Sequence, residues 1–250
     1  MAAISAIEQK LDIHPIDAVV QLGDFSLFWD KDGFVTALES LLDKYSVDGY
    51  FLDGNHDAWD VLCAMNFVGQ TTPQPFSERL FYLPRGVRWE WDGIQFAALG
   101  GGASIDWGMR ESGINWFPDE EIIAQRDFDR LVSGGPVDIL LTHDGPNTER
   151  MEQRLRKYRS ANRYTIDDAT EQLCKTQRNF ISAAIDKTEP ICLFHGHHHY
   201  AYATVYVGPR VYTNVFGLAA DGHTRSFRIL DTKDVSNLKK GWQRGIKVED

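Results

Sequence analysis

The chain has few cysteines and no pair of them with the spacing of a metal site. The cysteines are three, an odd number: Cys63, Cys174 and Cys192. This usage argues against a disulfide framework or a zinc–thiolate site and fits a reducing compartment. Because Cys63 and Cys192 lie in apolar stretches, we expect both to be buried thiols.

The chain also lacks a membrane segment and an excess of positive charge. No stretch approaches the roughly 20 apolar residues of a membrane helix, and the first residues, which include Glu8, lack the apolar core of a secretory signal. We therefore expect a cytoplasmic protein with no membrane partner. The 26 Lys and Arg residues are outnumbered by 36 Asp and Glu residues, for a net charge of −10. This balance argues against strong nucleic-acid binding.

What is present fits one α/β domain over residues 1–250, with an ordinary hydrophobic content of 43%. Asp92-Gly93 predicts a hairpin turn within residues 80–100. Apolar periodicity predicts helices at 2–12, 31–45, 119–132 and 166–186, and strands at 17–22, 49–53, 137–142, 190–194, 201–207, 210–215 and 224–230. This order of βα units followed by a meander favours two packed sheets with helices outside them.

Four short polar clusters follow four of the apolar runs. They are Gly23-Asp24, Gly54-Asn55-His56-Asp57, Thr142-His143-Asp144-Gly145 and Gly196-His197-His198-His199. In an open α/β sheet, ligands bind at the carboxyl ends of strands, so the four clusters can converge on one crevice. Together they offer carboxylate, amide and imidazole ligands, which suit a borderline divalent ion such as Mn²⁺, Fe²⁺ or Zn²⁺.

The order and spelling of these clusters resemble the calcineurin-like metallophosphoesterase superfamily, whose signature runs D-x-H, G-D, G-N-H-D/E, H and G-H-x-H. The likeness spans about residues 17–200 of this sequence. It implies an α-β-β-α sandwich of two packed mixed sheets flanked by helices, here without the usual first strand. It also implies metal-dependent hydrolysis of phosphoesters, as a phosphodiesterase or phosphatase, by a metal-activated hydroxide.

The resemblance implies a set of metal ligands. Asp24 would bridge two ions, Asn55, His143 and His197 would complete one position, and His199 would belong to the other. The implied ions are divalent, with manganese preferred and iron, zinc or nickel as alternatives. The implied substrate is a small phosphoester or a nucleotide.

The resemblance also implies the residues that act on the substrate. His56 would protonate the leaving group, because the pKa of imidazole lies near the working pH. Asp57 would hold the His56 ring, cap the following helix, or do both. His195 and His198 receive no metal role. Arg110, after the triple glycine, is either a phosphate clamp or part of an ion pair that anchors its loop.

The family's first motif has no counterpart after a strand. Asp12-Ile13-His14 spells D-x-H, but it precedes the strand that ends at Gly23-Asp24. At about 3.3 Å per residue, that strand would carry the chain to the other edge of the sheet, so we expect neither residue to bind metal. One metal position is then intact and tight, and the other is depleted. Three explanations stay open: a start further upstream, one tight and one weak ion, or a chain that binds metal but turns over poorly.

Two hypotheses of function follow. The leading one is a metal-dependent phosphoesterase, and the alternative is a metal-binding interaction scaffold with little or no turnover. A further open question is the arginine-rich stretch at 150–163. It either attracts a phosphate or nucleotide beside the cleft, or forms a solvated helix face paired with Glu149 and Glu152.

Overall fold

The structure, a computed structural model, describes residues 2–25, 33–161 and 166–242. Within them the strands form two mixed sheets. The first has the order β1-β2-β4-β3, with β1, β2 and β4 parallel and β3 antiparallel at the edge. Its strands are β1 (Ala18–Leu22), β2 (Asp48–Leu52), β3 (Gln74–Pro75) and β4 (Leu80–Tyr82).

The second sheet has the order β5-β6-β7-β8-β10-β9. Its four inner strands are parallel, and each edge strand is antiparallel to its neighbour. Its strands are β5 (Arg88–Trp91), β6 (Ile94–Leu99), β7 (Ile139–Thr142), β8 (Cys192–His195), β9 (Tyr202–Val207) and β10 (Tyr212–Gly217).

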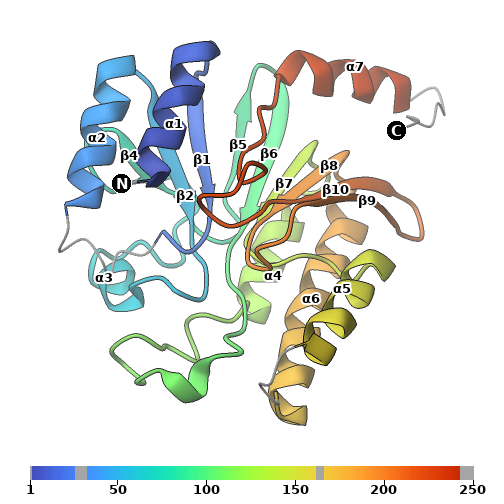
Figure 1. The fold of residues 1–250 in the computed structure, drawn as a ribbon. Helices are drawn as coiled ribbons and strands as arrows, with labels where there is room; N and C mark the ends of the chain where they lie inside the picture. The colour runs from blue at the N-terminus through green and yellow to red at the C-terminus, as the bar shows by residue number, and fades with distance from the viewer. Residues whose placement is uncertain (1, 26–32, 162–165, 243–250) are drawn as a thin grey trace.

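Helices cover the outer faces of both sheets. Figure 1 shows α1 and α2 along one flank of the molecule, α4, α5 and α6 along the other, and the strands between them. The helices are α1 (Ala2–Ile13), α2 (Phe34–Tyr45), α3 (Trp59–Ala64), α4 (Gln125–Ser133), α5 (Glu149–Ala161), α6 (Asp168–Thr188) and α7 (Thr232–Trp242). No helix among the described residues combines the length and the apolarity needed to cross a bilayer.

Alternation along the strands divides the apolar core into three layers. Phe51 on β2 packs toward the helices of the first sheet, whereas its neighbour Leu52 packs between the sheets. On β7, Leu141 lies between the sheets and Leu140 faces the helices of the second sheet. Successive strand residues point to opposite faces, so each strand contributes to two layers. The α-β-β-α sandwich expected from the sequence is confirmed.

Several local expectations are also confirmed. The Asp92-Gly93 turn joins β5 and β6 with φ of 51° and 75°, as a type I′ hairpin requires. Cys192 is buried, and burial raises the pKa of its thiol to about 11.

Three expectations are wrong. Cys63 is exposed. The helix expected from residue 119 begins only at Gln125, because the Arg85 guanidinium takes the carbonyls of Glu120 and Ile122 that a first helical turn would use. No strand forms at residues 224–230, since the Ser226 amide bonds the carbonyl of His223 in a turn.

Candidate metal centre and active site

The four polar clusters lie where β1, β2, β7 and β8 end. Asp24 follows β1, and its Oδ1 accepts the backbone N–H of His56, beyond β2, at 2.9 Å. On the second sheet, the backbone carbonyl of His143, beyond β7, accepts the N–H of Gly196, beyond β8. Each pair is parallel, so its two strands end at the same edge of their sheet, and contacts of His143 with Leu22 and Asn55 bring the two edges together.

Two glycines allow this close approach. Gly23 has φ of 91°, and a Cβ there would lie 2.0 Å from Nδ1 of His143. A Cβ on Gly54 would lie 2.2 Å from Oδ1 of Asp24. The glycines of the Gly-Asp and Gly-Asn motifs therefore make room for neighbouring side chains of the site as well as turning the chain.

Three atoms that can act as metal ligands surround Nε2 of His143. Asn55 Oδ1 and His197 Nδ1 each lie 3.1 Å from it, and Asp24 Oδ1 lies 3.3 Å from it. The other ring nitrogen, Nδ1, donates to the carbonyl of Leu22 at 2.7 Å. Because that carbonyl can only accept, it holds the proton on Nδ1 and leaves the Nε2 lone pair facing the cluster.

The chemistry of this donor set fits a divalent cation. The ionised Asp24 carboxylate and the Asn55 carbonyl oxygen can only accept hydrogen bonds, yet both face the lone pair of His143. A positive charge among them stabilises what is otherwise a repulsive arrangement. Ligand atoms about 2.0–2.2 Å from one ion lie about 3.0 to 3.5 Å apart, and the distances of the other three atoms from His143 Nε2 fall in this range. Mixed oxygen and imidazole ligands suit a borderline metal.

The charges around Asp24 favour its ionised form. Burial opposes ionisation, but the neighbouring rings of His143, His56 and His197, with the His56 N–H bond, hold the pKa of Asp24 below its usual value. Burial also lowers the pKa of His197, to about 3, although the charges of Asp144 and Asp24 oppose this shift. For His197 the lower pKa favours the neutral form. At neutral pH the cluster thus presents a carboxylate and a neutral imidazole, the forms that bind metal.

The Asn55 amide is fixed from behind by residues whose role the sequence did not predict. Its Nδ2 donates to Ser104 Oγ at 3.0 Å, which turns Oδ1 toward His143. Glu121, 2% exposed, accepts both the N–H and the hydroxyl of Ser104. The one sequence signal was the glycine-rich loop that precedes Ser104.

Arg110 supports the same residue. Its guanidinium donates to Ser104 Oγ at 2.6 Å and to the main-chain carbonyl of Asn55 at 3.2 and 3.3 Å. Its side chain is 8% exposed and lies 3.9 Å from Glu121. Of the two roles expected for Arg110, these contacts favour the loop anchor.

His56 lies beside a carboxylate, but the observed partner is Asp106. Its Nε2 is 3.6 Å from Asp106 Oδ2. Burial lowers the pKa of His56, with contributions from Arg110 and His143, and Asp24 and Asp106 oppose that shift. Asp57, which was expected to hold the ring or cap the helix, is fully buried and accepts the Gly54 N–H at 2.7 Å. The N-cap of α3 is Ala58, so the capping expectation is wrong.

A second group of donors adjoins the first. One ligand atom each from Asp144, His197 and His198 lie within 4.8 Å of one another. Asp144 Oδ1 bonds His198 Nε2 at 2.7 Å; burial opposes ionisation of Asp144, but the contact with His198 keeps the pKa of Asp144 far below its usual value. The bond ties the loop after β7 to the loop after β8. The sequence interpretation assigned no metal role to His198 and did not use Asp144.

The remaining predicted residues lie apart from the His143 cluster. His199 is exposed and lines a hollow on the outer side of its loop. His195 is fully buried and bonds the Tyr202 hydroxyl at 2.7 Å. Asp12, in the last turn of α1, accepts a hydrogen bond from Tyr45, at the end of α2. Asp12-Ile13-His14 thus stands before the first residue of β1, as the sequence indicated.

Unusual backbone conformations mark the same loops. Asp24, His197 and His199 have φ of 54°, 61° and 51°. Side chains other than glycine rarely adopt this left-handed region, and such residues concentrate at functional sites.

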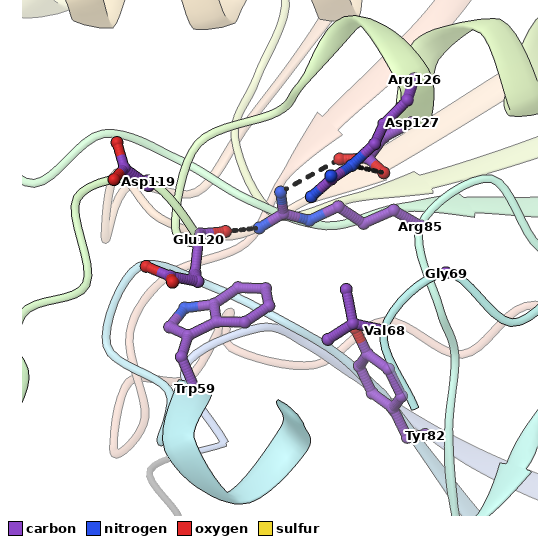
Figure 2. A pocket seen from close by; sticks show the side chains of 9 residues that line it. All are labelled: Trp59, Val68, Gly69, Tyr82, Arg85, Asp119, Glu120, Arg126 and Asp127. Atoms are coloured by element: carbon purple, nitrogen blue, oxygen red, sulfur yellow. Dashed lines mark hydrogen bonds and ion pairs between the residues drawn. The ribbon is translucent and has the colours of Figure 1, made fainter. Parts of the chain in front are cut away.

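A buried cation supports the loop after β2 from beneath. Arg85 donates from Nε to Asp53 Oδ2 at 2.9 Å and lies 4.6 Å over the ring of Trp59. Figure 2 shows its guanidinium directed at the Glu120 carbonyl and the Asp127 carboxylate. Arg85 lines the small pocket drawn in Figure 2. Because its partners satisfy the guanidinium, Arg85 stabilises the loop and the pocket offers no free charge to a ligand.

Comparison with known proteins identifies the family of the chain. The family model that describes calcineurin-like phosphoesterases matches residues 2–220 of the sequence, so the chain belongs to that family. Its members are generally metal-dependent phosphoesterases. No curated protein matches the chain.

Two solved structures resemble the chain at low identity. The protein TT1561 of Thermus thermophilus is 15% identical with a TM-score of 0.49, over 86% of this chain and 84% of that one. The sulfate thiohydrolase SoxB of Thermus thermophilus, in complex with glycerol, is 12% identical with a TM-score of 0.39. That alignment covers 98% of this chain but 46% of SoxB, so the chain spans about half of that protein.

Proposed function

We propose that this chain hydrolyses phosphomonoesters or phosphodiesters with a divalent ion, Mn²⁺ by preference, at the edge where β1, β2, β7 and β8 end. The observation that carries the proposal is the gathering of Asp24, Asn55 and His197 around Nε2 of His143. Bound divalent ions neutralise phosphoryl oxygens and lower the pKa of water.

The chain's own residues would divide the work. Asp24, Asn55, His143 and His197 would hold one ion. The assignment of His199 to a second position stays a prediction. Ser104 would keep Oδ1 of Asn55 aimed at the ion, and Arg110 would hold Ser104 and the Asn55 main chain in place.

His56 would deliver a proton to the leaving oxygen. Its ring is half-exposed and carries Asp106 on one side, so it can meet a substrate while the carboxylate holds it. Because burial lowers the pKa of His56, the protonated ring is a stronger acid than free imidazole. Transfer of this proton would matter most for alkoxide leaving groups, which are strong bases.

The test compares the parent chain with His56→Asn in added Mn²⁺. Substrates are thymidine 5′-phosphate esters with either a p-nitrophenyl or a methyl leaving group. We expect loss of turnover of about 10²- to 10⁴-fold for the methyl ester and a smaller loss for p-nitrophenolate, which leaves without a proton. His14→Asn, an exposed histidine at the far edge, is the matched control.

The outcomes separate the two hypotheses. Mn²⁺-dependent turnover that His56→Asn reduces selectively for the methyl ester supports the enzyme. A folded parent chain that binds Mn²⁺ but hydrolyses neither diester, nor the monoester p-nitrophenyl phosphate, would overturn the proposal and favour the metal-binding scaffold.

A further inference from the structure

The hollow lined by His199 opens beside the loop after β8. It has a volume of about 200 Å³ and lies between that loop and the loop after β10. We call it the rim hollow and define it by His199, Tyr200, His223, Thr224 and Arg225. Its lining starts at His199, two residues beyond His197 of the proposed metal cluster in the same loop.

The rim hollow is lined by groups that favour an anion. It presents the imidazoles of His199 and His223, the guanidinium of Arg225 and the hydroxyl of Thr224, and no carboxylate lines it among the described residues. In the described part of the chain, the Arg225 side chain has no acidic partner. An arginine guanidinium with its donors unused is well suited to a phosphate.

Two cations of α5 extend this basic surface. Arg150 donates to the Tyr200 hydroxyl at 3.2 Å, and the Arg154 guanidinium lies 4.3 Å over the Tyr200 ring. The acidic residues of the same turn are engaged elsewhere. Glu152 lies 3.5 Å from Arg178 on α6, and Glu149 accepts a bond from Gln153.

Of the arginine-rich stretch at 150–163, the side chains before residue 158 are described, and their contacts favour the first of the alternatives left open by the sequence. Its first two arginines border the rim hollow and contact Tyr200. Their positive charges add to that of Arg225 in a chain whose net charge is −10, so the local sign is opposite to the overall one.

We propose that the rim hollow is a second anion subsite that binds a phosphate group of the substrate other than the one being hydrolysed. The substrate class is then a phosphoester with a second phosphate, such as a nucleoside bisphosphate. The scissile group would occupy the His143 cluster while the second phosphate contacts Arg225 and His223. This assignment rests on the proposed function for the identity of the scissile group.

The experiment measures binding, so it does not depend on turnover. Calorimetry with added Mn²⁺ compares thymidine 5′-monophosphate with thymidine 3′,5′-bisphosphate in the His56→Asn background, which limits hydrolysis. We expect the bisphosphate to bind about fivefold more tightly, as one exposed charge pair with Arg225 and a hydrogen bond from His223 allow. Arg225→Gln should abolish this preference, and His223→Asn should reduce it. Arg210→Gln removes the same charge from the turn between β9 and β10 and should retain the preference.

Each result has a distinct meaning. Equal affinity for the two nucleotides in the His56→Asn chain without a further substitution would overturn the proposed subsite. A preference that survives in both Arg225→Gln and His223→Asn would also overturn it, because the second phosphate would then bind elsewhere. Should Arg225→Gln fail to fold, His223→Asn decides. Failure of the proposed function appears separately, as absence of hydrolysis by the parent chain.

Discussion

The His143 cluster and the rim hollow both contain histidines from the sequence motifs, but they are built differently. His143 is 1% exposed, with one ring nitrogen bound to the Leu22 carbonyl and the other facing three donor atoms. His199 is exposed, and its side chain makes no hydrogen bond or ion pair within the described residues. The fold thus orients the ligand atoms of the His143 cluster, whereas the His199 side chain in the rim hollow remains available to a ligand.

This difference follows from where the residues sit on the fold. The inner donors directly follow strands whose neighbours fix them through the sheet. The rim residues lie on loops that turn over the surface, where charged and polar side chains stay hydrated. A pre-oriented inner cluster is what metal binding needs, since ligands already in place lose little freedom when the ion binds.

The sharpest test of the comparison is to remove the central ligand. We expect His143→Ala to weaken Mn²⁺ binding by more than about 100-fold, since loss of a mere partner of a ligand costs about 10- to 100-fold. Calorimetry measures the affinity, and circular dichroism confirms folding. His14→Ala serves as the control. Near-parental affinity in folded His143→Ala would contradict the placement of the ion.

Burial of the inner histidines should also appear in the pH dependence of stability. Burial lowers the pKa of His195 to about 3. Below its ordinary value near 6.5 the unfolded chain takes up a proton that the folded chain refuses, so stability is full above about pH 6.5 and falls as the pH drops. We expect His195 to contribute about 2 kcal/mol of lost stability at pH 5.

The measurement is urea unfolding of the metal-free protein at pH 7.5 and pH 5, for the parent and for His195→Gln. The variant should lose less stability between the two pH values than the parent. Equal losses would show that His195 is not held neutral by the fold.

A smaller effect tests the support behind the inner cluster. Ser104→Ala removes the acceptor that aims the Asn55 oxygen, so we expect Mn²⁺ affinity to fall about tenfold. Ser133→Ala, in the exposed last turn of α4, is the matched control and should leave the affinity unchanged. An unchanged affinity in Ser104→Ala would mean that the Asn55 amide needs no such support.

The smallest effect is expected at the rim. His199→Ala should change the affinity of the His143 cluster for Mn²⁺ by no more than about twofold, as for other exposed side chains. A loss as large as that of His143→Ala would instead support the sequence prediction that His199 is a metal ligand. The number of ions bound per chain, measured by metal analysis, separates the two results.

The sequence predicted the strand-end motifs because each depends on local order. An apolar run followed by Gly-Asp or Gly-Asn-His-Asp is visible within about ten residues. The partners of those motifs are not local: Ser104 lies 49 residues from Asn55, and Asp106 lies 50 residues from His56. Asp57 was the nearest carboxylate in sequence, but the fold uses it to hold the Gly54 N–H.

The sequence by itself predicted the sandwich class and the strand ends that carry the motifs, and through its family resemblance it predicted that Asp24, Asn55, His143 and His197 belong to one site. Periodicity and the motifs encode these within short stretches. Only the tertiary structure decided the orientation of the Asn55 amide, the partner of His56 and the position of His199 at the rim. Those depend on contacts between loops far apart in the chain, and such contacts exist only once the two sheets have packed together.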